Sequence, residues 1–289
     1  MTGAAQIALL GDGRRLHLHH GPIDIIALAE GEDREVMAAY SQAGVRFAAI
    51  LDELVAELPR LRTSIGAARP LLNGSVARRM AAAVWPHRDA FVTPMAAVAG
   101  AVADDVLASL IKGRDLARVY INNGGDIAIH LAPGQCFDAG IVDDADAPAV
   151  DAKVRLAHDM PVRGLATSGW RGRSHSFGIA DAVTVLARSA AEADVAATLI
   201  ANAISVDHPA IKRAPANSLS DDSDLGELPV TVAVDELPDD AIEQALTAGL
   251  ARARAMQDAG LLFSAYLSLK GQVMTAGAGT PLSAARGAA

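Results

Sequence analysis

The stretch RGLATSGWRGRSHSFGIADAVTVLARSAAEADVAATLIANAI, residues 163–204, decides the fold that we expect for this chain. Its second half joins a short, almost wholly apolar run, Ala182–Ala187, to a run rich in small residues, Ala190–Ala203. Short β-branched apolar runs are typical of strands buried on both faces. Ser189, followed three positions later by Glu192, forms a capping box, which marks the start of a helix. The stretch therefore predicts a buried strand followed by a helix.

The first half of the same stretch is a turn, residues 167–173, with basic side chains around it. Thr167 and Ser168 supply hydroxyls, and Gly169 lets a ligand approach the backbone closely. Positive charge gathers here in a chain of net charge −9. The cations, with a histidine close behind, are Arg163, Arg171, Arg173 and His175. Guanidinium groups bind phosphate well, so the turn predicts an anion site. Surface ion pairs with acidic loops, which contribute little to stability, are the alternative.

The predicted helix carries Asp194 and Thr198 four positions apart. This spacing places both side chains on one face, about one turn apart. A carboxylate and a hydroxyl are oxygen ligands of the kind that Mg²⁺ or Ca²⁺ prefers, so the pair is a candidate metal site. The alternative is structural: Asp194 would favour the helix dipole, and Thr198 would bond back to a carbonyl.

Composition excludes several classes of protein. Of the 289 residues, 51% are hydrophobic and 20% charged, which is typical of a globular chain. The acidic balance leaves no broad basic face for nucleic acid or for an anionic membrane. A single cysteine, Cys136, excludes an internal disulfide and favours a reducing, cytoplasmic setting. We expect no signal peptide at residues 1–10, and the uncharged run 90–103 is too short to span a bilayer.

Along the rest of the chain, helical and strand-like segments alternate irregularly, which predicts an α+β fold with mixed or antiparallel sheets. Thr93 and Pro94 predict the start of an alanine-rich helix. The tail, residues 276–289, is rich in Gly and Ala and is expected to be flexible, after a single domain over residues 1–275. The predicted strands are 14–20, 23–28, 119–131, 137–142, 154–160, 182–187, 230–234 and 263–269, and the other predicted helices are 33–58, stopped by Pro59, 95–110 and 239–259.

Within the strand-like segment 119–131, the residues Asn122 to Asp126 read NNGGD. Asn-Gly is a strong hairpin signal. A bulged strand whose bare backbone faces a ligand would give the same pattern. Both interpretations stay open from the residues alone.

These motifs together resemble a known family. The segments VTPMAAVAGAVADD, YINNGGDIAIHL, TSGWRGRSHSFGIADAVTVLA and ADVAATLIANAI are similar to the uncharacterised bacterial and archaeal branch of the ApbE-like superfamily, over nearly the whole chain. The ApbE flavin transferases resemble the chain only at Asn123 to Asp126, Thr167 to Gly169, His175 and 193–198. After its histidine this chain reads SFGIAD, where the transferases have DPxTG.

The resemblance implies an ApbE-like fold, FAD or FMN as ligand, and a divalent metal held at Asp194 and Thr198. It implies a Mg²⁺-dependent FMN or nucleotidyl transferase, with His175 as a candidate acid or base. The residues expected to bind the cofactor are Asn123, Gly124, Gly125, Asp126, Thr167, Ser168, Gly169, Arg171 and Arg173. The alternative is a noncatalytic protein that binds or carries a cofactor, with one-carbon metabolism as its setting. The partner in either case is a small phosphate-bearing molecule, and the sequence does not define the oligomeric state.

Overall fold

The computed structural model of the chain describes residues 3–141, 152–172, 174–220, 223–277 and 283–284. The chain divides into two compact units. Unit 1 comprises Met1–Cys136, Ala157–Ala166 and Ala187–Val195, and unit 2 comprises Phe137–Leu156, Thr167–Leu186 and Ala196–Ala289. The chain passes from one unit to the other five times, within β6, β7, β8, β9 and α4. The prediction of a single domain over residues 1–275 stays a prediction.

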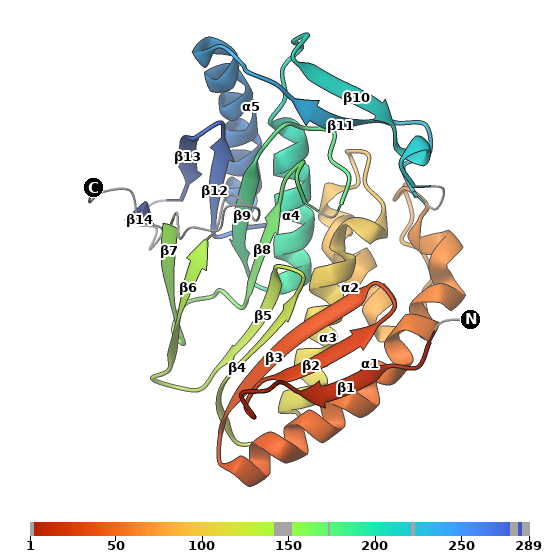
Figure 1. Ribbon diagram of the computed structural model, residues 1–289, viewed down its shortest axis with the longest axis vertical. Coiled ribbons are helices and arrows are strands. Elements are labelled where there is room, and N and C mark those ends of the chain that lie inside the picture. The colour runs from red at the N-terminus through yellow and green to blue at the C-terminus, as the bar shows by residue number, and fades with distance from the viewer. Residues whose placement is uncertain (1–2, 142–151, 173, 221–222, 278–282, 285–289) are drawn as a thin grey trace. The chain divides into compact units, whose positions relative to one another are not determined.

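Unit 1 contains an antiparallel sheet with the strand order β1-β2-β3-β4-β5, and the start of β8 pairs with β5 (Figure 1). One face of this sheet forms the core: β2 to β5 each place buried residues on it, such as Leu18, Ile25 and Ile121, whereas the edge strand β1 is exposed throughout. The strands are β1 (Gln6–Leu9), β2 (Leu16–His20), β3 (Ile23–Gly31), β4 (Leu116–Asn123), β5 (Asp126–Leu131) and β8 (Gly164–Ser168).

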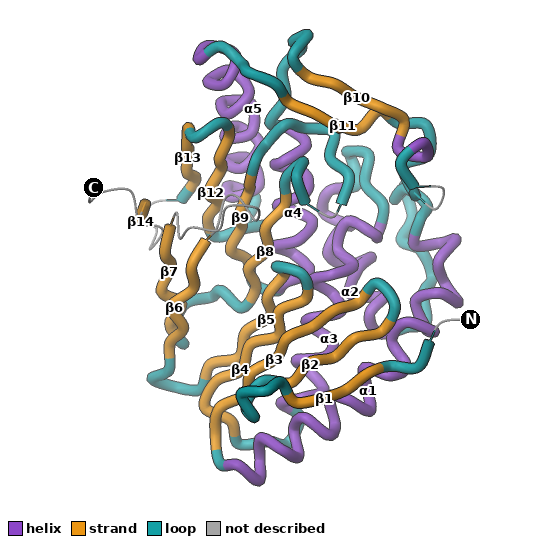
Figure 2. The backbone as a smooth tube through the Cα atoms, in the orientation of Figure 1, coloured by secondary structure: helices purple, strands orange, loops and turns teal. Residues whose placement is uncertain are grey.

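Helices cover the buried face of this sheet; Figure 2 shows them as purple tubes behind the orange strands. α1 packs on β2 and β3, and α3 packs on β4 and β5. The helical elements are α1 (Asp33–Leu61), α2 (Ser75–Val84), α3 (Val98–Ile111) and the 3₁₀ turns η1 (Trp85–His87) and η2 (Pro94–Ala97).

Two predicted helix limits are wrong. Pro59 does not stop α1, which continues to Leu61: the proline lacks only its own N–H donor, and the N–H of Arg62 still bonds to the carbonyl of Leu58 over 2.9 Å. The helix expected after Thr93 and Pro94 begins as the 3₁₀ turn η2. The backbone then leaves helical geometry at Ala97, with φ −126° and ψ 14°, so α3 has an N-terminus of its own at Val98.

Unit 2 contains three groups of strands and the helix α5. β9 pairs with β12, and β12 pairs with β13, all antiparallel, while α5 packs on β12 and β13. β10 and β11 form a separate hairpin. The strands are β6 (Cys136–Ile141), β7 (Ala152–Ala157), β9 (Ala182–Ala187), β10 (Ile211–Pro215), β11 (Pro229–Val234), β12 (Ser264–Leu269), β13 (Gln272–Ala276) and β14 (Ser283–Ala284), with η3 (Ala216–Ser218) and the helices α4 (Ala190–Ala203) and α5 (Asp239–Asp258).

The α+β prediction is confirmed: helices combine with antiparallel sheets. One helical segment, Pro94–Ile111, is long and apolar enough to cross a membrane by length and composition alone, but 56% of it is buried inside the protein. Core helices pass the same test, and α3 is the helix that covers β4 and β5. The cytoplasmic location stays a prediction. In the predicted tail, the residues 278–282 and 285–289 lie outside the described chain.

Candidate functional site

The NNGGD segment is a tight hairpin, which decides between the two interpretations of that motif. Asn123 ends β4, Asp126 begins β5, and the two residues pair across the turn. Gly124 and Gly125 both have positive φ, 66° and 111°, as a two-residue hairpin turn requires. The backbone N–H of Gly125 donates to the Asn122 side-chain oxygen over 2.8 Å. The turn therefore presents Asn123 and Asp126 side by side on the buried face of the sheet.

Both of these side chains reach toward the start of α3. Asn123 is 7% exposed and its amide Nδ2 donates to the carbonyl of Ala99 over 3.0 Å. Asp126 is 8% exposed and is hydrogen-bonded to the side chain of Asp194. Unit 1 thus brings three of the sequence-predicted site residues together: Asn123, Asp126 and Asp194.

Asp194 of α4 also caps α3. Its Oδ2 accepts the backbone N–H of Gly100 over 3.0 Å, and the N–H of Ala99 bonds to the same carboxyl group. Ala99 and Gly100 are the second and third residues of α3, whose N–H groups have no partner within the helix. Asp194 therefore caps α3; the alternative interpretation, in which it favours the dipole of its own helix, stays a prediction.

The reverse contact caps α4. Asp104, the seventh residue of α3, accepts the backbone N–H groups of Ala190 and Ala191 over 3.0 Å each. Ser189 completes the cap by accepting the N–H of Glu192 over 3.2 Å. The two helices approach closely because residue 100 is glycine: a Cβ at Gly100 would lie 2.3 Å from the carbonyl oxygen of Ala190. α3 and α4 therefore cross at their N-terminal turns.

The pKa of Asp194 at this crossing is unusual for an aspartate. Burial raises the pKa of Asp194 to about 7, and the negative charge of Asp104 acts in the same direction, against the hydrogen bonds from Gly100, Ala99 and Asp126. Burial also raises the pKa of Asp104. Because Asp126 and Asp194 are hydrogen-bonded through their side chains, one of the two carboxyl groups must carry the shared proton. The pair is therefore poised to exchange a proton for another cation near neutral pH.

The donor set suits a cation that binds only a few protein groups. Among the described residues, no group of three or more His, Cys, Asp or Glu side chains is arranged to hold a metal. Mg²⁺ is commonly held by one or two carboxylates, with substrate phosphates and water as the remaining ligands. Thr198 lies one turn after Asp194 on α4, and its hydroxyl makes no hydrogen bond within the described part of the chain. The predicted back-bond from Thr198 to a carbonyl is thus absent there.

The predicted phosphate-binding turn lies in unit 2, where the residues around Asp181 fix its shape. The Thr167 and Thr184 hydroxyls are 2.8 Å apart. Gly169 is buried against the backbone, since a Cβ there would lie 2.3 Å from the carbonyl oxygen of Asp181. The N–H of Trp170 donates to the carbonyl of Ala180 over 3.0 Å. Hydrogen bonds and close backbone packing therefore hold this turn in one conformation.

Asp181 is the acidic centre of this turn. Its carboxylate accepts the indole N–H of Trp170 over 3.3 Å and the backbone N–H of Lys270 over 2.6 Å. Arg171 lies 3.4 Å from the same carboxylate and stacks on the Trp170 ring, with the guanidinium carbon 5.1 Å from the ring centroid. The ion-pair alternative for the arginines therefore holds in part for Arg171, whose side chain is still 40% exposed.

The other residues predicted for the phosphate-binding turn differ in how much the structure describes of them. His175 is half-buried and makes no hydrogen bond with the residues that the structure describes. Ser168 is half-buried at the end of β8. Arg173 lies outside the described residues.

Arg171 belongs to unit 2 and Asp194 to unit 1, so the prediction that they border one cavity stays a prediction. Arg163 donates to the backbone carbonyls of its own loop, at His158, Met160 and Val162.

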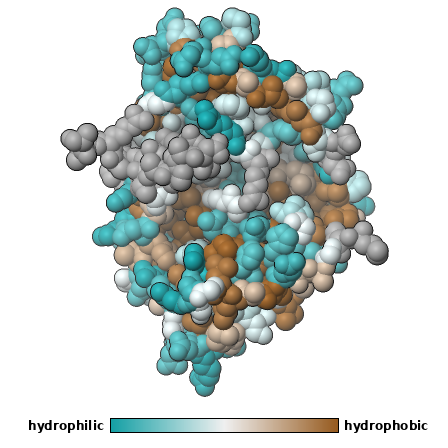
Figure 3. Space-filling model, viewed as in Figure 1, coloured by the Kyte–Doolittle hydropathy of each residue, from teal (hydrophilic) through white to brown (hydrophobic). Residues whose placement is uncertain are grey.

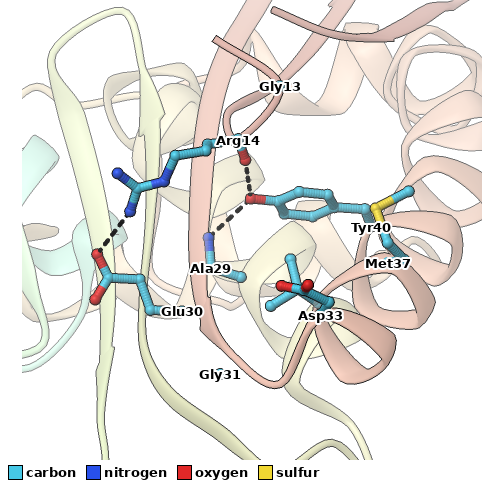
Figure 4. Close-up of a pocket in the computed structure, with 9 residues that line it drawn as sticks. Gly13, Arg14, Ala29, Glu30, Gly31, Asp33, Met37 and Tyr40 are labelled. Carbon is cyan, nitrogen blue, oxygen red and sulfur yellow. Dashed lines mark hydrogen bonds and ion pairs between the residues drawn. The ribbon is translucent and has the colours of Figure 1, made fainter.

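A cavity of about 540 Å³ is lined by none of the predicted site residues. It lies in unit 1 between α1 and the ends of β2 and β3 (Figure 4). Arg14 and Glu30 pair across it over 3.6 Å. The Tyr40 hydroxyl donates to the carbonyl of Arg14 over 2.7 Å and accepts the N–H of Ala29 over 3.0 Å. Because Arg14, Glu30 and Tyr40 already bond to one another or to the backbone, this cavity is a weaker candidate than the crossing of α3 and α4.

Two residues that organise these sites were not predicted. Neither Asp104 nor Asp181 lies in a local sequence pattern that predicts its role. Both act through contacts with residues far away in the sequence, Ala190 and Lys270. The sequence did carry a signal for close contacts near these acids: Gly100 and Gly169 are glycines, which let the backbone of another segment approach closely.

Known proteins resemble this chain over most of its length. The model of the family described as AbpE bacteria matches residues 7–275. A UPF0280 protein of Methanopyrus kandleri is 34% identical over 188 residues, which cover 63% of this chain and 73% of that protein. A UPF0280 protein of Methanospirillum hungatei is 31% identical over 177 residues, covering 60% and 70%. One of Methanocaldococcus jannaschii is 38% identical over 113 residues, covering 39% and 45%.

Among solved structures, the chain is similar to the flavinyl transferase ApbE of Pseudomonas stutzeri in its apo form. The two chains are 12% identical, with a TM-score of 0.45, over 95% of each.

Proposed function

Since this chain belongs to the AbpE bacteria family, we propose that it binds a flavin-like, phosphate-bearing cofactor or nucleotide together with a divalent cation. The observation that carries this proposal is the hydrogen-bonded pair of Asp126 and Asp194, in which burial raises the pKa of Asp194 to about 7. A carboxyl pair that shares a proton near neutral pH favours replacement of that proton by a cation.

The cation in this proposal is Mg²⁺, held by the carboxylate of Asp194 with Asp126 beside it and the hydroxyl of Thr198 one turn away. Two acidic side chains are too few for an all-protein site, so phosphate oxygens of the ligand complete it. When bound, the cation neutralises the charge of the phosphates and orients them. Ca²⁺ uses the same oxygen ligands and is the second choice of metal.

For the phosphate groups we propose the turn of unit 2 as the binding element. Asp181 holds Arg171 against Trp170, which fixes the direction of the guanidinium group while leaving its side chain 40% exposed. The hydroxyls of Thr167 and Ser168, the backbone at Gly169 and the side chain of Arg173 are the other proposed contacts. Guanidinium and hydroxyl donors together bind phosphate oxygens.

The ligand class and the reaction come from the family resemblance. The NNGGD, TSG and AD…AT motifs are similar to those of the flavin transferases, which favours FAD or FMN as ligand. We infer a transfer in which an acceptor hydroxyl attacks a phosphorus atom of the diphosphate and the other phosphate leaves. His175 would accept the proton of that hydroxyl.

A second candidate function is binding without turnover, as a cofactor carrier, with one-carbon metabolism as its proposed setting. The observation that favours it is that His175 has no hydrogen-bond partner in the described part of the chain, so no residue there orients the ring for acid–base chemistry. His175→Ala separates the two functions. A carrier keeps its affinity for the cofactor and its cellular role, whereas a transferase keeps affinity and loses turnover.

Calorimetric titration tests the proposal with FAD, FMN and ADP, each in the presence of Mg²⁺ or of a chelator. We expect one of these ligands to bind at least about tenfold more tightly with Mg²⁺. Absence of Mg²⁺-dependent binding for all three ligands would overturn the proposal.

Matched variants locate the cation in this experiment. Asp194→Asn and Thr198→Val should abolish the Mg²⁺-dependent part of the affinity, and Thr198→Ser should restore it. Glu192→Gln is the control, since Glu192 lies on the same helix and pairs with Arg188 at the surface. Equal losses in Asp194→Asn and Glu192→Gln would count against Asp194 as a ligand.

A further inference from the structure

Arginines gather between the end of α1 and the start of α3. Residues 60–88 contain six arginines and no aspartate or glutamate, although the chain as a whole has a net charge of −9. The six are Arg60, Arg62, Arg69, Arg78, Arg79 and Arg88. A stretch with charges of one sign attracts ligands of the opposite sign. The acidic balance of the whole chain excludes a broad basic face, but this segment is a local exception.

Two of these arginines contact one indole ring. The guanidinium carbons of Arg69 and Arg88 lie 5.0 and 4.8 Å from the centroid of the Trp85 ring. Trp85 begins the 3₁₀ turn η1, and Arg88 follows that turn, with its backbone N–H bonded to the carbonyl of Trp85 over 3.3 Å. Side chains three positions apart lie one above the other in this geometry, so the local fold brings Arg88 to the ring.

Arg69 comes from the loop between α1 and α2, and hydrogen bonds hold both ends of this loop. Near its start, the N–H of Ile65 donates to the carbonyl of Val92 over 2.9 Å. At its end, the buried carboxylate of Glu57 accepts the N–H of Gly74 over 2.8 Å. Arg69 therefore meets Trp85 from an anchored loop, which lowers the entropy that its side chain loses when a ligand binds.

The contact with the ring leaves both charges without an acidic partner. Both side chains are exposed, and neither forms an ion pair with a residue that the structure describes. Arg88 Nη1 donates to the carbonyl of Trp85 over 3.1 Å, which uses one of the several N–H donors of its guanidinium group. Because both groups lie against one ring, they are within about 10 Å of each other, about one Debye length, and repel each other. An anion that accepts their remaining N–H groups removes this repulsion.

We propose that Arg69 and Arg88, held by Trp85, form a binding site for phosphate groups. Guanidinium groups bind phosphate oxygens through paired N–H donors. A phosphate monoester carries about two negative charges near neutral pH, which matches two arginines better than a single carboxylate does. The site goes beyond the proposed function: it shares no residue with the proposed cofactor site, and it needs no metal, because the arginines supply the positive charge.

The phosphate has two possible sources, a soluble phosphate compound and the headgroup of an anionic lipid. Leu71, two residues after Arg69, is 89% exposed. Exposed apolar side chains are ordinary, and Figure 3 shows hydrophobic residues among hydrophilic ones over the face in view. Next to a cationic site, however, such a side chain also suits insertion into a lipid surface. Leu71 therefore distinguishes the two sources experimentally.

Calorimetric titration of the full chain with sodium pyrophosphate, in metal-free buffer of constant ionic strength, tests the soluble source. We expect saturable binding with a dissociation constant below about 1 mM, weakened at least about tenfold by Arg69→Ala and by Arg88→Ala. Omitting metal separates this result from the proposed cation site. Arg34→Ala is the matched control, since the Arg34 side chain is 86% exposed and lies 4.0 Å from Glu35. Equal weakening by Arg34→Ala would overturn the site.

The fluorescence of Trp85 shows whether the anion binds beside the ring. The chain has two tryptophans, so a Trp170→Phe background leaves Trp85 as the sole indole emitter. We expect its emission to change with pyrophosphate and to saturate at the same dissociation constant as the calorimetric signal. Emission that stays constant while pyrophosphate binds would place the anion elsewhere and overturn the proposal. Thermal unfolding confirms that each variant is folded.

Sedimentation with phosphatidylcholine vesicles, with or without phosphatidylglycerol, tests the lipid source. If the phosphate belongs to a lipid, the chain sediments only with the anionic vesicles, and Arg69→Ala abolishes this binding. Leu71→Asp should then weaken vesicle binding at least about tenfold and leave the affinity for pyrophosphate unchanged. If the phosphate is soluble, pyrophosphate binds and neither kind of vesicle does. A chain that binds neither pyrophosphate nor anionic vesicles would overturn the proposal.

Discussion

Asp104 and Asp194 each cap the helix that carries the other. Asp104 belongs to α3 and accepts two N–H groups at the start of α4, whereas Asp194 belongs to α4 and accepts N–H groups at the start of α3. Most caps come from the residue just before their own helix. This reciprocal arrangement makes the position of Asp194 depend on both helices, so the proposed cation site and the core of unit 1 share the same hydrogen bonds.

Asp104→Ala should destabilise the protein by about 2 kcal/mol, because two N–H groups of α4 lose their acceptor in a half-buried place. The free energy of unfolding in urea measures this loss. Ser189→Ala is the control: it removes the local cap of the same helix, which supplies a single hydrogen bond, and should cost about 1 kcal/mol or less. If both variants lose the same free energy of unfolding, the cap that Asp104 supplies from α3 stabilises α4 no more than the local cap by Ser189 does.

Gly100→Ala should cost about 3 kcal/mol, since its new methyl group would lie 2.3 Å from the carbonyl oxygen of Ala190 and force α3 and α4 apart. Thermal unfolding compares it with Gly66→Ala, where a Cβ would meet nothing within 4 Å and the change should stay within about 0.5 kcal/mol. A Gly100→Ala protein as stable as Gly66→Ala would mean that the helices do not cross this closely.

The raised pKa of Asp194 predicts how stability depends on pH. The folded chain keeps a proton on this group up to about pH 7, whereas the unfolded chain loses it near pH 4. The contribution of Asp194 to stability is therefore complete below about pH 4 and is lost as pH rises through 7, by on the order of 4 kcal/mol in total.

Asp194→Asn removes this titration while keeping an oxygen that can accept the Gly100 N–H. Unfolding free energies measured between about pH 5 and pH 8 should fall less steeply in this variant than in the original chain. Parallel profiles for the two proteins would show that Asp194 has an ordinary pKa in the folded state.

Arg171→Ala should weaken binding of the phosphate-bearing ligand by at least about tenfold, because it removes a guanidinium group that Asp181 and Trp170 hold in place. Lys212→Ala is the control, since Lys212 is another exposed cation of unit 2 and pairs with Asp235 over 2.9 Å. Calorimetric titration of both variants decides between a specific contact and a general effect of charge. An equal loss in both would remove Arg171 from the proposed site.

The sequence predicted best those helices, strands and turns whose own residues mark their ends. The bounds of β9 and α4 match the prediction, because a β-branched run and a capping box mark them clearly. The NNGGD hairpin follows from two glycines that must adopt positive φ. The elements that were missed, which include α2 and strands β1, β10 and β13, depend on pairing or packing with distant segments, such as β13 with β12.

The site was predicted less completely than the fold, for a related reason. Spacing on one helix identified Asp194 and Thr198, and the hairpin motif identified Asn123 and Asp126. The contact between Asp126 and Asp194 joins residues that are far apart in the sequence, and no spacing rule predicts it. The role of Asp104 was missed because a capping acid is recognised by its place before its own helix, whereas Asp104 caps another helix.

Electron paramagnetic resonance of Mn²⁺, used in place of Mg²⁺, tests the central claim most directly. With FAD present, we predict one bound Mn²⁺ per chain, with hyperfine coupling to phosphorus, and loss of this signal in Asp194→Asn but not in Glu192→Gln. A spectrum of free Mn²⁺ that FAD does not change, or a bound signal that survives in Asp194→Asn, would contradict the account.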